Sequence, residues 1–153
     1  MKRVAVLLLP PAFGCATLHG GSTAGADSPT TAIQRFLDAA KRKDLAAMEQ
    51  VWGTEKGVAS KTMSRRELER RELIMMQCLH HEKATLGAAG PSEGGRLRIP
   101  VAMSIGTKRA TPMFTVSRDS GNRWFVENFD IDNLRDQGFC ALPAAAPTTP
   151  PKP

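Results

Sequence analysis

Apolar residues in the first half of the chain recur at helical spacing. Between residues 32 and 40 they fall every three or four positions, which gives one apolar face and predicts a helix. Asp27 or Ser28 can cap its N-terminus, with Pro29 in the first turn, and the basic residues 41–43 end it. The folded region is therefore predicted to begin close to residue 29.

A second, shorter helix is predicted after Asp44, a residue type that often caps helix N-termini. Its apolar face consists of Leu45, Met48, Val51 and Trp52. Residues 53–60 are predicted to form a loop that leads to the next helix.

The third predicted helix has the clearest start. Ser64 and Glu67 match a capping box, and the helix is predicted to run from there to residue 79 or 80. Charged residues on its outer face are spaced four apart and form weak ion pairs, Arg65 with Glu69 and Glu67 with Arg71. A solvated helix face explains this pattern. The alternative is a binding patch made of Arg65, Arg66, Arg70 and Arg71.

After residue 81 the hydrophobic period changes to two, which indicates strands. The predicted strands are residues 83–89, 97–105, 113–118 and 123–129. Turns are predicted at residues 90–95, 106–109 and 119–122. Pro100 has no N–H group to donate, so it is predicted to lie at a bulge or an edge.

Helices that precede hairpin-connected strands predict an α+β fold. We expect three N-terminal helices packed on a curved antiparallel sheet of about four strands. The domain is predicted to span residues 29–142, a length that can bury one core. Residues 143–153 contain only Pro, Ala, Thr and one Lys and are predicted to be a disordered tail.

The first residues of the chain have the layout of an export signal. Lys2 and Arg3 precede an apolar run at residues 4–9, which Pro10 and Pro11 end. Such a run is too short to span a bilayer, because a transmembrane helix needs about 20 apolar residues. We therefore predict a cleaved leader rather than a membrane-spanning helix.

The segment Ala12-Phe13-Gly14-Cys15 resembles the bacterial lipobox, in which a cysteine receives diacylglycerol before the leader is removed. The resemblance implies a signal peptide at residues 1–14 and a lipid on Cys15 that holds the protein on a membrane. By resemblance to enterobacterial sorting, Ala16 after the anchor implies the outer membrane of the cell envelope. Residues 15–28 are predicted to be a flexible tether.

A rival cleavage site is present at Ala24-Gly25-Ala26, where small residues flank the middle position. Cleavage there would remove residues 1–26 and release a soluble periplasmic or secreted protein. The apolar run ends much closer to Cys15 than to Ala26, which favours the first site.

Cys78 and Cys140 remain as a pair once Cys15 is lipidated or removed. In an oxidising compartment they can form a disulfide that closes a long loop. The alternative is two unrelated cysteines, because the distance between their Cα atoms decides whether a bridge can form.

The charge balance is only mildly basic. The 21 Lys and Arg residues outnumber the 15 acidic ones, and removing Lys2 and Arg3 with the leader leaves 19 basic residues. Single-stranded nucleic acids need a basic stripe interleaved with aromatic residues, but the chain has no Tyr and its basic residues are dispersed. We expect no nucleic-acid partner.

The order of the predicted elements resembles the nuclear transport factor 2-like superfamily, a cone-shaped α+β fold. Within it, the chain is similar to small envelope lipoproteins that carry one such domain of unassigned function. The resemblance covers about residues 30–134. It rests on residues 32–40 followed by Lys43-Asp44-Leu45, on the short helix at residues 48–52, and on the last strand, Arg123-Trp124-Phe125-Val126-Glu127-Asn128-Phe129. The superfamily hosts enzymes, ligand carriers and assembly domains, so the fold alone implies no activity.

Enzymatic chemistry has little support in the sequence. Steroid-isomerase-like proton transfer needs a carboxylate base and a donor to the enolate oxygen, commonly a Tyr hydroxyl, and the chain has no Tyr. Cys78, His80 and His81 are potential metal ligands, but adjacent histidines on a helix point about 100° apart. We expect no catalytic residue, no metal and no other cofactor.

We therefore expect a lipid-anchored, non-catalytic envelope domain that binds a partner protein or a small apolar ligand. The alternative is a soluble secreted domain with steroid-isomerase-like or dehydratase-like activity in the cone cavity. The site is expected between the third helix and the concave face of the sheet. The residues predicted to line it are Trp52, Met75, Leu79, Met103 and Trp124.

Overall fold

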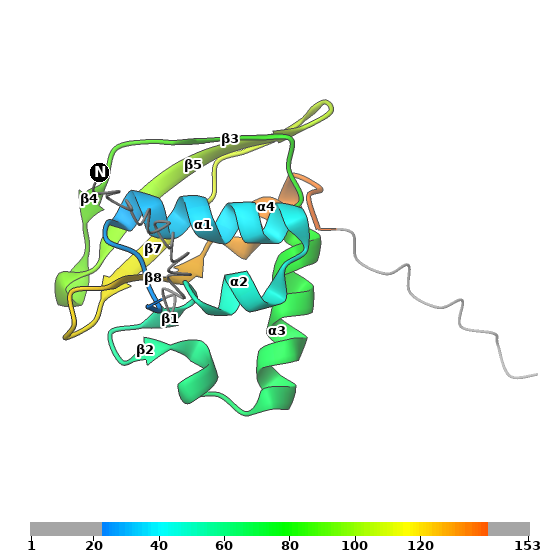
Figure 1. Cartoon of the computed structure of the whole chain (residues 1–153). Coiled ribbons are helices and arrows are strands. Elements are labelled where there is room, and N and C mark those ends of the chain that lie inside the picture. The colour runs from blue at the N-terminus through cyan, green and yellow to red at the C-terminus, as the bar shows by residue number, and fades with distance from the viewer. Residues whose placement is uncertain (1–22, 141–153) are drawn as a thin grey trace, which may run out of the picture.

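A computed structural model describes residues 23–140, which form an α+β fold (Figure 1). Cys15, the leader and the Pro-rich tail lie outside the described residues. The predicted fold class is confirmed, since four α-helices in the described part accompany a mainly antiparallel sheet. None of the helices in the described part is both long and apolar enough to cross a membrane.

The three predicted helices are present, and a polar side chain caps each one. α1 (Pro29–Arg42) begins after Ser28, whose Oγ accepts a hydrogen bond from the N–H of Thr31. α2 (Leu45–Glu49) and α3 (Arg65–Cys78) begin after Asp44 and Ser64, which accept from backbone N–H groups in the same way. These side chains satisfy N–H groups that lack a partner within the helix, which is why the starts were predictable.

The ion pairs predicted on the outer face of α3 are present. Arg65 contacts Glu69 at 2.7 Å and Arg71 contacts Glu67 at 2.6 Å. Glu67 also accepts from Arg70, and the bonds to both arginines lower the pKa of the Glu67 carboxyl to about 2. The side chain of Glu67 therefore binds Arg70 and Arg71 of the same helix, and not the backbone N–H of Ser64 as a capping box requires.

The sheet has six strands instead of the predicted four or so. They are β3 (Lys83–Leu86), β4 (Gly90–Pro91), β5 (Leu97–Ile105), β6 (Lys108–Ala110), β7 (Met113–Arg118) and β8 (Trp124–Phe129). The main order is β3-β5-β7-β8, and β4 and β6 also pair with β5. β4 and β6 were not predicted, because they are short and overlap the predicted turns at residues 90–95 and 106–109.

Pro100 lies within β5 without disrupting the sheet. β3 pairs with β5 up to Leu86, and β4 pairs again from Gly90, so the neighbouring strand is interrupted opposite Pro100. The N–H of Gly87 donates to the Pro100 carbonyl at 2.8 Å, and a Cβ at residue 87 would lie 2.8 Å from the Pro100 ring. The predicted bulge is thus in the partner strand, and glycine allows the close approach.

Three further elements depart from the sequence-based expectation. The predicted loop at residues 53–60 holds a small hairpin, β1 (Gly53–Thr54) with β2 (Gly57–Val58), and begins the 3₁₀ turn Ala59–Lys61. The predicted second helix ends at Glu49, so Val51 and Trp52 lie beyond it. α4 (Ile131–Asp136) follows the last strand and was not predicted, because six residues are too few for a periodic pattern.

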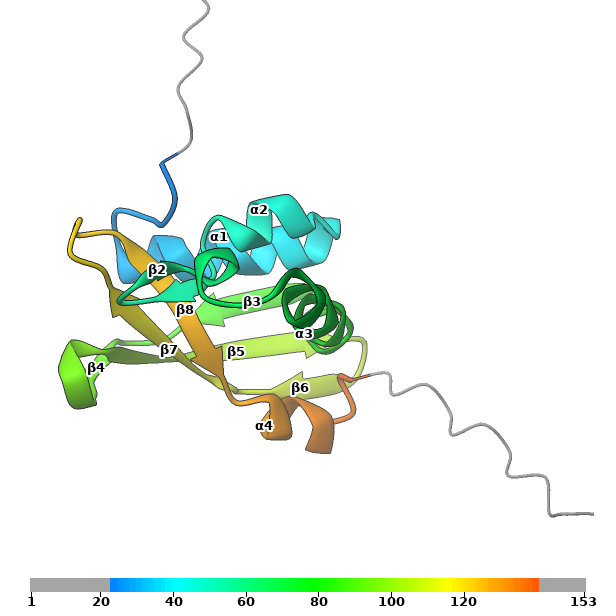
Figure 2. The same ribbon diagram turned by 90° about the horizontal axis from the view of Figure 1, so that it is seen from below.

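The layers are clear from a second direction. Figure 2 shows α1 and α2 on one side of the sheet, with α3 across one end and α4 near β6. α1 buries Ile33, Phe36 and Leu37 against the sheet, where Phe114, Val116 and Val126 are fully buried. The core therefore lies between the helical layer and the inner face of β5, β7 and β8.

Two segments from earlier in the chain pair with the outer edge of β8, the edge that no strand of the sheet occupies. Ala26 and Trp124 exchange two backbone hydrogen bonds, of 2.9 and 2.8 Å. Farther along β8, the N–H of Val126 donates to the carbonyl of Val51, and Trp52 forms a parallel bridge with Val126. The end of the predicted tether is thus part of the fold.

Gly25 is needed in this arrangement. Its φ of 81° lies in the left-handed region, and a Cβ there would meet Arg123 at 2.7 Å and the Phe125 ring at 2.8 Å. The guanidinium of Arg123 donates to the carbonyls of Ala24 and Gly25 and pairs with Asp27. The segment before α1 is therefore tied to β8 by side-chain as well as backbone bonds.

Cys78 and Cys140 form a disulfide, as one of the two sequence alternatives predicted. The bridge joins the last residue of α3 to the chain after α4, across a separation of 62 residues. It attaches the end of the described chain to the helical layer. Both sulfurs are engaged, so neither cysteine is a free thiol.

The disulfide is expected to contribute strongly to stability. The double substitution Cys78→Ser with Cys140→Ser should lower the free energy of unfolding by about 4 kcal/mol, because it frees a loop of this length in the unfolded chain. Urea denaturation of the oxidised and dithiothreitol-treated proteins measures the effect. Cys15→Ser is the matched control. Equal stability of the oxidised wild type and the double variant would contradict this expectation.

Candidate functional site

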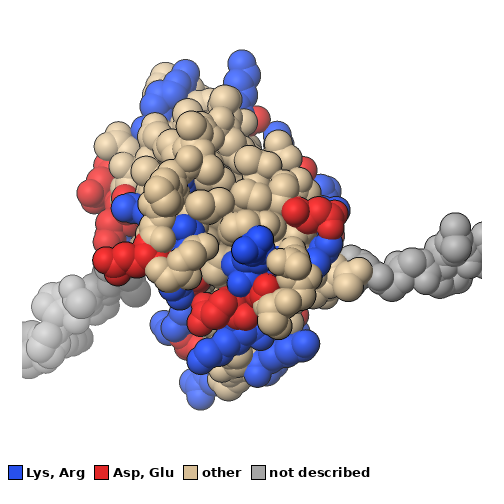
Figure 3. Space-filling view, turned by 90° about the vertical axis from the view of Figure 1, so that its left-hand side faces the viewer, with Lys and Arg blue, Asp and Glu red and all other residues tan. Residues whose placement is uncertain are grey.

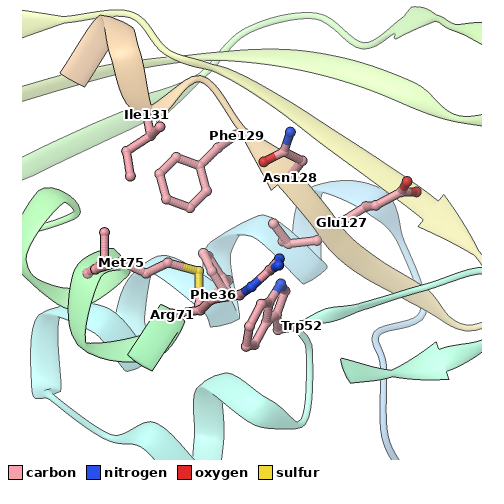
Figure 4. A pocket seen from close by; sticks show the side chains of 10 residues that line it. Phe36, Trp52, Arg71, Met75, Glu127, Asn128, Phe129 and Ile131 are labelled. Atoms are coloured by element: carbon pink, nitrogen blue, oxygen red, sulfur yellow. The ribbon is translucent and has the colours of Figure 1, made fainter. Parts of the chain in front are cut away.

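A cavity of about 220 Å³ lies between α1, α3 and the end of β8 (Figure 4). Its apolar lining comes from α1, the segment after α2, α3, β8 and the start of α4, and consists of Phe36, Trp52, Ile74, Met75, Val126, Phe129 and Ile131. Three polar residues complete the wall, Arg71, Glu127 and Asn128. The cavity is thus mainly apolar with a few polar groups, which is typical of a small-molecule site.

A bulge in β8 explains why consecutive residues of one strand line the cavity. Val126 pairs with Val116, but Asn128 pairs with the adjacent Thr115, so Glu127 is an extra residue in the strand. In a regular strand, neighbours would point to opposite faces. The bulge breaks this alternation and brings residues 126–129 to the same site.

Aromatic packing positions the inner wall. The ring of Phe129 stacks on Phe114 at 5.4 Å between centroids and meets Phe36 at 6.3 Å with a tilt of 56°. Phe36 is fully buried because it belongs to the apolar face of α1. These contacts give the cavity a rigid aromatic side.

Trp52 reaches the cavity through tertiary hydrogen bonds rather than through a helix. The bridge to Val126 holds its backbone beside β8, and its carbonyl accepts from the N–H of Ala59. Figure 4 shows the nitrogen-bearing edge of its ring turned toward β8. No hydrogen bond within the described residues engages this indole nitrogen or the side chain of Asn128.

The two charged residues of the wall are already paired. The Nε of Arg96 donates to both carboxylate oxygens of Glu127, at 3.0 and 2.8 Å, and this raises the pKa of the Arg96 guanidinium. Arg71 donates its Nε to Glu67 at 2.6 Å. The carboxylate of Glu127 is therefore neutralised by Arg96, the residue immediately before β5.

The structure separates the five predicted lining residues into three places. Trp52 and Met75 line the cavity. Leu79 and Met103 are buried in the core, with 0% and 2% exposure, and do not line it. Trp124 lies at the opposite end of β8, where the guanidinium of Arg118 lies 5.5 Å from its ring centre. Periodicity showed which residues face inward, but not which of them border an unfilled space.

The main lining residues that the sequence analysis missed are Phe36, Phe129 and Ile131. Phe36 and Phe129 are in the periodic apolar patterns of α1 and β8, so they were read as ordinary core residues. Ile131 belongs to the unpredicted α4. No local signal in the sequence distinguishes these residues from core residues.

Metal ligands do not gather within residues 23–140. No group of three or more His, Cys, Asp and Glu side chains there is arranged to hold a metal ion. Cys78 is in the disulfide, and His81 is buried with its Nδ1 at 2.7 Å from the carbonyl oxygen of Leu79. The neighbouring His80 is exposed, so the two histidines do not share a site.

Comparisons with protein-family models, with curated proteins and with solved structures found no match to this chain. Function is therefore inferred from the cavity and its surroundings.

One buried carboxyl lies beside the cavity, on the inner face of α3. Glu72 is 1% exposed, and neither of its carboxyl oxygens has a hydrogen-bond partner among the described residues. Burial raises the pKa of this carboxyl, and the negative charge of Glu49 on α2 raises it further, to about 7. Glu72 therefore favours its neutral form in the folded protein at mildly acidic pH.

Glu72 should make stability depend on pH. Its pKa is about 7 in the folded chain and 4.5 ordinarily, so the unfolded chain loses the proton first as the pH rises. The free energy of unfolding should fall between pH 4.5 and 7, by about 3 kcal/mol, and should not change further above this window. Urea denaturation at several pH values should show the fall in the wild type and not in Glu72→Gln.

Glu67→Gln is the control on the same helix. The pKa of Glu67 is lowered to about 2, so its contribution is present above pH 4.5 and is lost as the pH falls toward 2. It should leave the window between pH 4.5 and 7 unchanged. An identical slope in wild type and Glu72→Gln would show that Glu72 is not the titrating group.

Proposed function

We propose that this protein is a lipid-anchored, non-catalytic envelope domain that binds a small apolar ligand in the cavity between α3 and β8. The observation that carries the proposal is the cavity itself, whose walls are mostly aromatic and aliphatic side chains from five separate segments. Filling it would bury apolar surface, which is favourable by about 25 cal/mol per Å².

The size of the cavity restricts the ligand. Sites for drug-sized ligands typically measure about 300 to 1,000 Å³, and this cavity of about 220 Å³ is smaller. A single ring or a short branched chain fits this volume. The aromatic side formed by Phe36 and Phe129 favours a flat ring.

The polar groups restrict the ligand further. The indole N–H of Trp52, a residue that is 5% exposed, is a donor without a described partner. Asn128 is exposed to solvent, and Arg71 and Glu127 are engaged in ion pairs. One hydroxyl or carbonyl oxygen on the ligand would satisfy a free donor. The proposed ligand is therefore an uncharged single-ring compound with one oxygen.

The enzymatic alternative has weaker support. Proton transfer would need a carboxylate free to act as a base in the cavity. Glu127 is the carboxylate among the lining residues, and Arg96 occupies both of its oxygens. The absence of Tyr from the whole chain also removes the usual phenol donor.

We retain as a proposal the resemblance to the nuclear transport factor 2-like superfamily, with which the order of helices before hairpin strands is compatible. The observed order places α1 to α3 before the main sheet, and the cavity lies where α3 meets that sheet. α4 extends this plan after the last strand.

The segment at residues 24–26 supports cleavage before Cys15 over cleavage after Ala26. Cleavage after Ala26 would remove Ala24, Gly25 and Ala26, which Arg123 and Trp124 bind in the fold. It would also leave that end of the β8 edge unpaired. Cleavage before Cys15 keeps these contacts and leaves a cysteine at the N-terminus, the position from which a lipid can anchor the domain.

The charged residues on one face of the domain give no indication of a nucleic-acid partner. On the face shown in Figure 3, acidic and basic side chains are interspersed around a broad area without charged residues. A nucleic-acid site would instead show a continuous basic stripe.

Ligand binding can be tested with 4-methylphenol as the probe and benzoate as the charged comparison. We expect 4-methylphenol to bind with a dissociation constant of about 10 µM to 1 mM, since ligands of this size rarely bind more tightly. Ile131→Phe should weaken binding at least about tenfold, because the larger side chain fills part of the cavity. Ligand-observed NMR measures both values.

Leu73→Phe is the matched control for this test, because Leu73 is 59% exposed on α3 and does not line the cavity. It should bind 4-methylphenol like the wild type. Equal affinity of the two variants, or no saturable binding to the wild type, would rule out the cavity as the site.

The lipid anchor can be tested by expressing the full chain in a bacterium with two membranes. The mature protein in the membrane fraction should have the intact mass of a chain that begins at Cys15 and carries diacylglycerol. Cys15→Ser should abolish this mass, and Ala24→Gln, which blocks the alternative site at a half-buried residue, should not. A mature protein that begins at Asp27 would contradict the proposal.

A further inference from the structure

We propose that Glu72 and Glu49 form a pH-sensitive latch between α3 and α2, which holds the α3 wall of the cavity in place in mild acid and loosens it in mild base. This inference rests on the proposed role of the cavity as the binding site, because the latch would control entry to that site.

The first observation is the position of the Glu72 side chain. It is 1% exposed, and both of its oxygens lack hydrogen-bond partners among the described residues. A neutral carboxyl tolerates such a place, whereas an unpaired carboxylate there is strongly unfavourable. Ionisation must therefore draw water to Glu72 or move α3 outward.

The second observation is the set of charged groups around Glu72. Glu49 on α2 and Arg65 and Glu69 on α3 lie close enough to act on its pKa, which Glu49 and Glu69 raise and Arg65 lowers. Arg65 is not free to neutralise Glu72, because it contacts Glu69 at 2.7 Å and lies 3.8 Å from Glu49. An ionised Glu72 would therefore repel Glu49, the α2 residue that lies 3.8 Å from Arg65 of α3.

Protonation gives the opposite result. A neutral Glu72 has one O–H group to donate and an anionic neighbour in Glu49 to receive it. Burial, followed by the charge of Glu49, places the pKa of Glu72 at about 7, so the change of state falls near neutral pH. The same contact thus attracts below neutrality and repels above it.

The third observation connects the latch to the cavity. Arg71 and Met75, one residue before Glu72 and three after it, both line the cavity. The disulfide at Cys78 holds the C-terminal end of α3, so the helix is tethered beyond the latch and not at it. Outward movement of α3 around Glu72 would therefore shift the α3 side of the cavity away from β8.

Trp52 provides a readout that needs no ligand. The chain has two tryptophans, and Trp124 lies outside the cavity, so Trp124→Phe leaves Trp52 as the single reporter. Acrylamide quenching of Trp52 should increase about two- to threefold between pH 5 and pH 9, with a midpoint near pH 7. Glu72→Gln in the same background should remove this transition.

Two further variants distinguish the latch from a general effect of pH. Glu49→Gln removes the neighbouring charge, so the midpoint should move to lower pH by about one unit. Glu67→Gln, on the outer side of α3, should leave the midpoint unchanged. These variants also keep the test decisive if Glu72→Gln fails to fold, because an unchanged midpoint in Glu49→Gln would overturn the proposal.

The proposal is also overturned if Trp52 quenching in the wild type is the same at pH 5 and pH 9, or if Glu72→Gln shows the same transition. Failure of the binding proposal gives a different result. If 4-methylphenol does not bind but the Glu72-dependent transition occurs, the latch stands and the ligand is wrong. If 4-methylphenol binds equally at both pH values without a transition, the binding site stands and the latch falls.

Discussion

The free edge of β8 is the constraint on which the rest of this structure depends. A strand at the edge of a sheet leaves N–H and C=O groups unpaired, and these groups need partners. Here Ala26 pairs at one end of the edge, and the Val51–Trp52 segment pairs farther along it. Both segments are far from β8 in the chain. Their hydrogen bonds to β8 therefore position both the start of the domain and the Trp52 side of the cavity.

The cavity is a result of the same strand. The bulge at Glu127 brings consecutive residues of β8 to the cavity wall, and the bridge to Val126 brings Trp52 beside them. The ion pair between Arg96 and Glu127 occupies both oxygens of the one lining carboxylate, which is then not free to act as a base. The proposed binding role rests on this pairing, since the lining group left without a partner among the described residues is a neutral donor, the indole N–H of Trp52.

α3 shows how position on one helix determines the behaviour of identical side chains. Glu67 lies toward solvent between two arginines, and its carboxylate is stabilised. Glu72, a little more than one turn later, is buried near the like charge of Glu49, and its neutral form is stabilised. The helical period predicts that the two residues lie on different faces, but only the tertiary structure, which buries Glu72 and brings Glu49 near it, reverses the effect on the carboxyl.

By itself, the sequence determined the local structure: the capped starts of α1, α2 and α3, and the central strands β5, β7 and β8, because caps and hydrophobic periods act within a few residues. It also indicated the cysteine pair, but not that the two sulfurs meet. The tertiary structure alone decided the strand β4, the departure of Trp52 from the predicted helix, and the choice of Phe36 and Phe129 as lining residues. These outcomes depend on backbone and side-chain partners from distant parts of the chain, and no pattern within a short window records which partners will meet.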